Sequence, residues 1–419
     1  MPYQTALTIG APVRPGAEDD LDQLLASMGD GVANGSVIDF SQLTGVHYAR
    51  IVLLEETVDL EGKPLPAQLI LMSDLDISPT KHLRELVSSA GEGIDRVFGH
   101  CEGYTPGDRH GYLRRHVVQE QARYVNTVGR TMRQITQEAQ LREAIQRLLD
   151  ESGDDWSRID PGVVRARVRE LVESTPDLAW ARKPAERPGG LAKLRETVHM
   201  VALPLLLLPL LPFALLAAPL YLIVLRRLEK TDPAPHVKPT QERVDELASL
   251  EDHMTQNPFM AVGFVKPGRF RELTLRGVVF AISYVARHVL NRGDLAGVKT
   301  IHFARWVFLD GRRRMYFASN YDGSLESYMD DFIDKISWGL NLVFTNGIGY
   351  PRTRWLIKDG CRDELAFKDY LRLHQVRTLV WYPAYGRLST ANVAANERLR
   401  KGLHSDLRGD REREWVQAL

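Results

Sequence analysis

An internal repeat limits the folds open to this chain more than any other feature. The segment from Ile301 to Pro351 repeats an upstream segment from Val46 to Tyr104. The matches, all 246 residues apart, are Ser73 with Ser319, Asp76 with Asp322, Gly93 with Gly339, Val97-Phe98 with Val343-Phe344, and Gly103-Tyr104 with Gly349-Tyr350. Immediately before them, His47-x-Ala49-Arg50-x-Val52 matches His302-x-Ala304-Arg305-x-Val307 at a spacing of 255. The repeat predicts that one structural unit occurs twice.

Apolar patterning predicts a β-β-α-β order in each copy. In the first copy, the strands are Val46–Glu56 and Gln68–Asp74, a helix opens at Pro79, and Ile94–Phe98 is a short strand or a helix extension. In the second copy, the strands are Lys299–Leu309 and Arg314–Ser319, a helix includes Met329 and Ile336, and Asn341–Phe344 is a strand. A later helix (Glu364–Leu373) and strand (Val376–Tyr382) complete the second copy.

The predicted fold class is α+β, with two ferredoxin-like repeats. A sheet with one bare face must be covered, so we expect the two copies to form a sheet pair or a barrel. The predicted divisions are a loose lead-in (1–36), the first repeat (37–108), a helical insertion (109–196), a membrane segment (197–225), a linker and helix (226–297), the second repeat (298–386), and a C-terminal helix and tail (387–419).

A long uncharged segment runs from Thr197 to Leu225, 29 residues in all. Such a run is typical of a membrane segment, because about 20 apolar residues suffice to cross a bilayer. We therefore predict a lipid membrane as a partner. The residues expected to contact it are Leu205, Leu208, Pro209, Pro212, Phe213 and Leu216.

Three features favour a re-entrant or monotopic hairpin over a full crossing. Four prolines interrupt the segment, at positions 204, 209, 212 and 219. Basic residues flank both ends, which by the positive-inside tendency places both ends on the cytoplasmic side. Two repeats that pack together must also share one compartment, so we expect both on the cytoplasmic side. The alternative is a tilted single span, for which the segment is long enough.

The repeated strand start supplies candidate ligand-binding residues. His47 and Arg50 recur as His302 and Arg305, and positions three apart on a strand point to opposite faces. Histidine at a strand start is usually a structural, hydrogen-bonding residue. In the functional alternative, Arg305 holds a carboxylate or propionate group in a bidentate contact.

Further candidates lie around the second copy. His374 precedes the last predicted strand and is either structural or an axial iron ligand or general base. Tyr382, at the end of that strand, is a candidate ligand contact. Asp322 is either a helix N-cap or a distal acid–base group. Any function should be sought at residues special to the second copy, which are Trp306, Asn320 and Gly323.

The duplicated unit resembles the dimeric α/β-barrel superfamily and, in its tandem single-chain form, the dye-decolourising peroxidases. The resemblance rests on element order and duplication across the two repeated segments. It implies haem held by a proximal histidine, here His374, with a distal aspartate and arginine, here Asp322 and Arg305, handling peroxide. Of the family's G-x-x-D-G distal motif, this chain retains Asp322-Gly323, and no histidine-containing proximal signature surrounds His374.

The balance of charges argues against nucleic acid as a partner. The 54 basic and 54 acidic residues give no net field that would attract nucleic acid. Two function classes remain open. One is a membrane-associated, peroxidase-like oxidoreductase that acts on an apolar small molecule and for which haem is a possible cofactor. The other is a non-enzymatic membrane-surface module that binds lipid or a protein partner.

Overall fold

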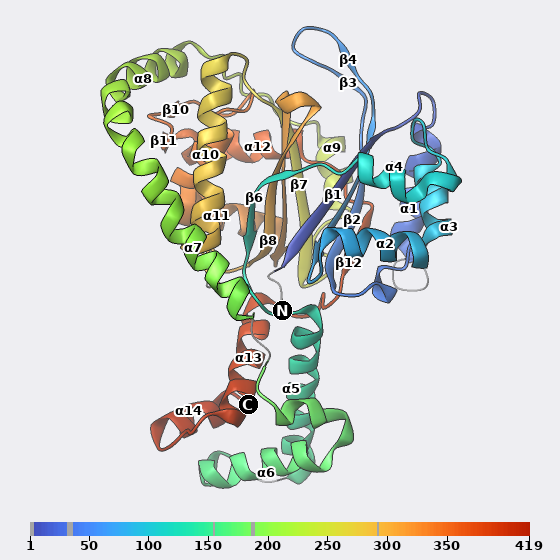
Figure 1. Ribbon diagram of the computed structural model, residues 1–419, viewed down its shortest axis with the longest axis vertical. Coiled ribbons are helices and arrows are strands. Elements are labelled where there is room, and N and C mark those ends of the chain that lie inside the picture. Colours follow the sequence, from blue (N-terminus) through green and yellow to red (C-terminus); the bar gives the residue numbers. More distant parts are fainter. Residues whose placement is uncertain (1–3, 32–36, 154–155, 186–188, 291–292) are drawn as a thin grey trace.

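Two four-stranded antiparallel sheets face each other at the centre of the molecule, and helices cover the outer side of each (Figure 1). The computed structural model describes residues 4–31, 37–153, 156–185, 189–290 and 293–419. The fold is therefore α+β, as predicted. Neither sheet closes into a barrel.

The two copies extend further than the sequence match and share one order of elements. The first contains β1 (Thr5–Pro12), α1 (Glu18–Gly31), β2 (Val46–Leu54), β5 (Gln68–Leu75), α2 (Pro79–Ser89), α3 (Gly91–Phe98), α4 (Arg109–Arg115) and β6 (Glu120–Val125). The second contains β7 (Gln256–Phe264), α10 (Arg269–His288), β8 (Ile301–Leu309), β9 (Arg314–Asp322), α11 (Leu325–Phe344), α12 (Glu364–His374) and β12 (Val380–Pro383). Even a helix break recurs, since Ala90 separates α2 from α3 and Ile336 leaves helical geometry inside α11, 246 residues later.

The copies exchange their last strands. The first sheet has the order β1-β5-β2-β12, and the second has the order β6-β8-β9-β7. Thus β12 from the second copy pairs with β2 of the first, and β6 from the first copy pairs with β8 of the second. The segments just before these strands bond to their own copy, as in Val118 N to Thr8 O (2.9 Å) and Val376 N to Met260 O (2.9 Å). The exchange ties the sheets together at both edges.

Apolar side chains pack between the two sheets, and further apolar clusters cover the outer face of each sheet. The inner cluster includes Val52, Met72, Val307 and Tyr316, all buried. Helices α1 to α4 cover the outer face of the first sheet, and α10 to α12 cover that of the second. The β8–β9 connection is a tight turn, with Gly311 at a φ of 63° that favours glycine.

Several predicted segments fold differently. The lead-in (1–36) contains β1 and α1, although residues 1–3 and 32–36 lie outside the described residues. The predicted helical insertion (109–196) contains β6, and the predicted linker (226–297) contains β7. Asn341–Phe344, predicted as a strand, ends α11, whereas Ile94–Phe98 forms helix α3, in line with the helix extension that was one of its two predicted alternatives. Periodicity does not separate a strand from a helix in apolar runs this short.

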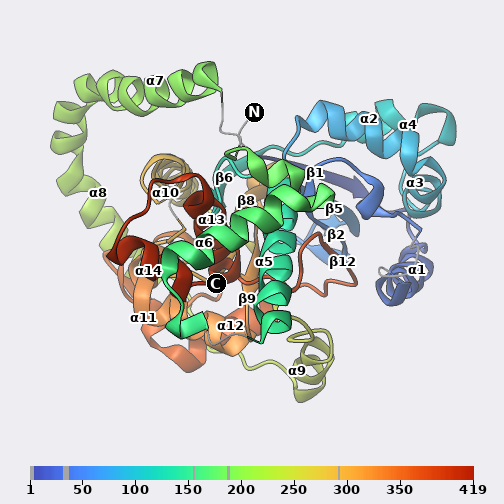
Figure 2. The same cartoon turned by 90° about the horizontal axis from the view of Figure 1, so that it is seen from below.

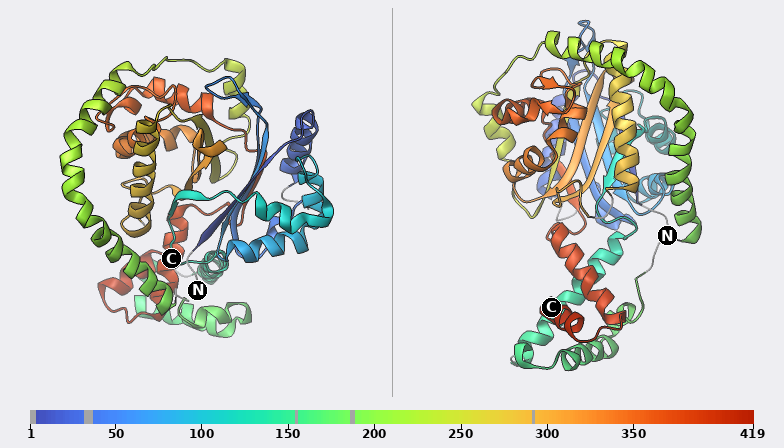
Figure 3. Two further views of the ribbon diagram at one scale, coloured as in Figure 1. Left: turned by 45° about the horizontal axis from the view of Figure 1, so that its top comes forward. Right: turned by 90° about the vertical axis from the view of Figure 1, so that its left-hand side faces the viewer.

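The remaining elements lie around this centre. A stalk of four helices extends below the sheets: α5 (Met132–Ser152), α6 (Pro161–Ser174), α13 (Thr390–His404) and α14 (Asp410–Gln417) (Figures 1 and 3). The others are α7 (Gly190–Leu207), α8 (Leu211–Thr231), α9 (Gln241–Ala248), and two small hairpins, β3 (Thr57–Val58) with β4 (Pro64–Leu65) and β10 (Thr353–Arg354) with β11 (Lys358–Asp359). Ser389 caps α13 through a capping box.

Candidate functional site

The uncharged segment forms a bent helical run that we call the strap, residues Gly190–Thr231. It consists of α7, a short 3₁₀ turn (Leu208–Leu210) and α8. Among the described residues it is the one helix long and apolar enough to cross a membrane. Pro209 and Pro212 lie in the first turns of new helical segments, where proline fits without losing a hydrogen bond but redirects the chain. The strap consequently curves around α10 (Figure 2).

Polar contacts attach the N-terminal end of the strap to the C-terminal end of α10. Arg287 of α10 forms a bidentate ion pair with Glu196, with N–O distances of 2.6 and 2.5 Å. Beside it, the Nδ1 atom of His199 lies 2.7 Å from the Nε2 atom of His288. The hydroxyl of Tyr284 donates to the carbonyl of Met200 at 2.6 Å.

The C-terminal end of the strap is attached near the start of α10. The ring of Tyr221 stacks on that of Phe270, with centroids 5.0 Å apart. Further along, the buried carboxylate of Glu229 accepts hydrogen bonds from the backbone N–H groups of Trp355 (3.0 Å) and Leu356 (2.8 Å). Both ends of the strap are thus fixed to the same folded body.

Between these anchors the apolar side chains of the strap face outward. Phe213 is 70% exposed and Leu216 is 80% exposed. Exposed apolar surface of this extent on a soluble protein marks an interaction site. The cationic side chains of Lys193, Arg227 and Lys230 are also exposed at the two ends. An apolar stretch with basic residues at its ends is typical of a segment that lies in the surface of a membrane.

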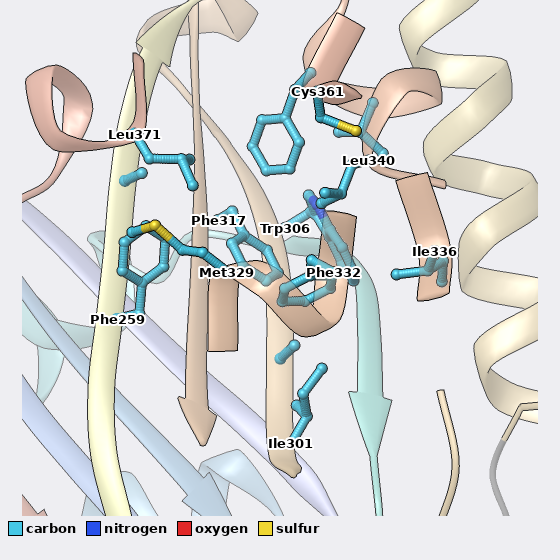
Figure 4. Close-up of a cluster of buried hydrophobic side chains, with 14 of the residues drawn as sticks. Phe259, Ile301, Trp306, Phe317, Met329, Phe332, Ile336, Leu340, Cys361 and Leu371 are labelled. Carbon is cyan, nitrogen blue, oxygen red and sulfur yellow. The ribbon is translucent and has the colours of Figure 1, made fainter. Parts of the chain in front are cut away.

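A large cavity, which we call the arch cavity, lies between α10, α11 and the second sheet, with the strap at its edge. Its volume is about 610 Å³. The lining is almost wholly apolar and includes Tyr221 of the strap, Leu273 and Ile282 of α10, and Trp306, Phe332 and Trp338. Figure 4 shows Trp306, Phe317 and Phe332 packed together beside α11, and the Trp306 and Phe317 ring centroids are 4.9 Å apart. A cavity of this size and lining suits an apolar molecule.

A change in pH tests the N-terminal anchor. Burial lowers the pKa of His288 below its ordinary value of 6.5, and Arg287 and His199 add to the effect. Because folding lowers the pKa of His288, the folded protein favours its neutral form. The contact of His288 with His199 is therefore present above pH 6.5 and is lost as the pH falls through the lowered pKa. We expect intrinsic-rate-corrected hydrogen exchange of α7 to increase between about pH 7 and pH 5, and that of α8 to stay constant. A His288→Gln variant should lose this difference. Equal exchange of α7 at both pH values in the unmodified protein would contradict the expectation.

The predicted ligand-binding arginines lie between the two sheets, in one buried network. Arg305 donates to the carbonyls of Leu7 and Ser73, both at 3.0 Å, and pairs with Asp74. Arg50 donates to the Phe259 carbonyl at 2.9 Å and also bonds to Asn320. The space around them measures only about 10 Å³. These residues hold the sheets together, and the space beside them is smaller than any carboxylate ligand.

The two arginines are electrostatically unequal. Asp74 of the first copy is replaced by Asn320 in the second, so two buried arginines share one carboxylate. Burial lowers the pKa of Arg50 to about 10, against the opposing effect of Asp74. Burial also disfavours the charge on Arg305, but Asp74, Tyr316 and Glu120 together outweigh this effect, so the pKa of Arg305 is raised.

The strand-start histidines each form a pair with an aspartate that holds a stalk helix. His302 Nε2 lies 2.7 Å from Oδ1 of Asp322. The Oδ2 atom of Asp322 accepts a hydrogen bond of 2.7 Å from the N–H of Thr390, at the start of α13. His47 and Asp76 repeat this arrangement at 2.6 Å, and Asp76 accepts the N–H of the first residue of α5 at 2.6 Å. Asp322 therefore acts at a helix start, and the cap of α11 itself is Ser324.

His374 and Tyr382 lie apart from this network. His374 ends α12, and its Nδ1 atom contacts the carbonyl of Tyr370 at 2.7 Å. Burial lowers the His374 pKa, against the opposing effect of that carbonyl. Tyr382 packs with Phe40 in the outer core of the first sheet. No hydrogen bond joins any two of His374, Asp322 and Arg305 in the described part of the chain.

The residues around His374 do not fit a haem. The cavity beside His374 measures about 20 Å³. A pocket for a cofactor as large as haem measures about 300–1,000 Å³. The arch cavity is large enough, but its lining contains no histidine. Across the described residues, no group of three histidine, cysteine or acidic side chains is placed to hold a metal ion.

Sequence reasoning identified the strap but missed the arch cavity. The signal that was available is the row Leu273, Gly277 and Ala281, in which two small residues lie on one face of α10. Of the residues special to the second copy, Trp306 lines the cavity, Asn320 belongs to the arginine network and Gly323 occupies a turn at a φ of 83°.

Comparisons with protein-family models, with curated proteins and with solved structures find no match for this chain.

Proposed function

We propose that the protein is a monotopic, lipid-binding protein of the membrane surface, on one leaflet of which the strap lies. The observation that carries this proposal is that both ends of the strap attach to one folded body while its apolar middle is exposed. The ferredoxin-like assignment of the two copies belongs to the same proposal, supported by their common element order and recurring helix break.

A full crossing would require the strap to leave its anchors. The two ends of a spanning helix are separated by a hydrocarbon core about 30 Å thick. Because both anchors lie on one folded body, that body would have to enter the bilayer unless one end gave up either the Glu196–Arg287 ion pair or the buried Glu229 contacts. Giving up the Glu229 contacts would lose its hydrogen bonds from the Trp355 and Leu356 N–H groups, and a hydrogen bond to a charged group contributes about 1.5–3 kcal/mol. Lying in one leaflet keeps both anchors and still covers the exposed apolar side chains.

The geometry gives the oxidoreductase alternative little support. Arg305 and Asp322 are already engaged in contacts that hold the sheets and the stalk. His374 faces a cavity of about 20 Å³. A membrane-surface module requires none of these residues to be free, and it uses the most exposed apolar feature of the described chain.

Vesicle flotation tests the proposal. The detergent-free protein should float with vesicles of phosphatidylcholine and phosphatidylglycerol. Salt at about 1 M, where the Debye length is about 3 Å, should weaken the binding but not abolish it, because the apolar contribution is unscreened. Protein that stays in the bottom fraction at low salt would contradict the proposal.

A further inference from the structure

We propose that the arch cavity binds a single fatty acyl chain that enters from the membrane leaflet beside the strap. The inference rests on the proposed function, because the chain is supplied by the bilayer on which the strap lies. It adds a specific binding site and a ligand class to that function.

The shape of α10 makes room for such a chain. Leu273, Gly277 and Ala281 follow one another at intervals of four residues and so lie on one face of the helix. A Cβ atom built on Gly277 would meet nothing within 4 Å. The small residues therefore leave open space where larger side chains would fill it.

The cavity borders the surface that would contact lipid. Tyr221 belongs both to the strap and to the cavity lining. At the rim, Leu273 is 62% exposed and Trp338 is 46% exposed. A chain moving from the leaflet into the cavity would thus remain in contact with apolar side chains throughout.

An acyl chain fits the site better than a second protein chain or the strap itself. The anchors at Glu196–Arg287 and Tyr221–Phe270 hold the two ends of the strap against opposite ends of α10. This attachment keeps the strap from collapsing into the cavity, and a partner helix would have to pass between the strap and α10. A flexible chain one carbon wide has no such restriction.

Few polar atoms line the cavity, and they suit a carbonyl oxygen. The hydroxyls of Tyr221 and Thr274 lie 3.3 Å apart at the edge of the strap. Both can donate to an ester or carboxyl oxygen. The indole Nε1 of Trp306, also in the lining, has no hydrogen-bond partner among the described residues. We place the polar end of the ligand at the Tyr221–Thr274 pair, with the chain running toward Trp306.

Binding of cis-parinaric acid, a fluorescent fatty acid, tests the inference. We expect one saturable site per chain and quenching of tryptophan emission by energy transfer, because Trp306 and Trp338 line the cavity. A Gly277→Leu variant should weaken binding at least tenfold, because the added side chain fills the cavity. Ala281→Phe, one turn away, should do the same. Gly107→Leu adds an identical side chain at another open glycine, outside the cavity lining, and should bind like the unmodified protein.

Flotation of the same variants separates the two proposals. All three should float with vesicles, since none changes the strap. If the unmodified protein floats but shows no saturable parinarate site, or if Gly277→Leu and Ala281→Phe bind as tightly as Gly107→Leu, the acyl-chain site is overturned and the surface protein stands. If parinarate fails to bind and Gly277→Leu changes the oligomeric state, a second copy occupies the cavity, which also overturns the inference. Failure to float overturns the membrane-surface function itself.

Discussion

A chain that carries both Phe213→Glu and Leu216→Glu is expected to lose vesicle binding by a factor of roughly one hundred or more. Both side chains project outward from the strap. Burying a Phe or Leu side chain is worth about 1.5–3 kcal/mol, so losing two such contributions exceeds about 3 kcal/mol, and each 1.4 kcal/mol is a factor of ten. Glutamate also repels anionic headgroups. The measurement is the partition coefficient of the variant on vesicles containing phosphatidylglycerol.

The matched control is Leu191→Glu. Leu191 is 86% exposed at the start of the strap but lies outside the uncharged segment. The partition coefficient of the Leu191→Glu variant on vesicles should therefore lie within about twofold of that of the unmodified protein, because a surface substitution away from the interface changes little. Equal binding by the double variant and the Leu191→Glu control would show that the exposed middle of the strap does not contact lipid.

An Asp74→Asn variant is expected to lose about 3 kcal/mol or more of its free energy of unfolding. Asp74 is the carboxylate partner of Arg305, and Arg50 is buried beside it. Removing that charge leaves two buried arginines without a counter-charge. Breaking a buried pair by removing one partner costs about 3–5 kcal/mol. Urea unfolding followed by tryptophan fluorescence and circular dichroism measures the change.

Asp406→Asn is the control for this second prediction. Asp406 pairs with Arg408 at 3.2 Å, and both side chains are largely exposed. An exposed ion pair contributes about 0–1 kcal/mol, so this variant should unfold almost like the unmodified protein. Asp74→Asn should still bind vesicles under native conditions, since the network is remote from the strap. An unchanged midpoint for Asp74→Asn would mean that the arginine network does not hold the sheets together.

The repeat predicted two copies of one unit, and the structure has two copies with matching elements. The strands that were missed are short or contain residues unusual in strands. Gly10 and Pro12 lie in β1, and Pro258 lies in β7, an edge strand, where proline is tolerated. The exchange of β6 and β12 could not be predicted from the sequence for another reason. Which strand a segment pairs with depends on the packing of the whole sheet, and local residue patterns carry no information about it.

The repeated His and Arg residues illustrate how a conspicuous motif can be structural. Arg50 and Arg305 recur because each crosses from its own sheet to backbone carbonyls of the other. His47 and His302 recur because each pairs with an aspartate at the start of a stalk helix. The arch cavity, by contrast, is a space between elements, and the sequence shows only the small residues that leave it open.

The most direct test of the central claim is the sidedness of the two ends of the strap. The substitution Leu191→Cys places a cysteine at the start of the strap and Val237→Cys places one beyond its end, both at exposed positions. The native thiols of Cys101 and Cys361 are buried, which raises their pKa values to about 12 and about 11, so they should not react. A membrane-impermeant maleimide should label both introduced cysteines from the same face of sealed vesicles and neither from the other face. Labelling of one from each face would contradict a monotopic strap.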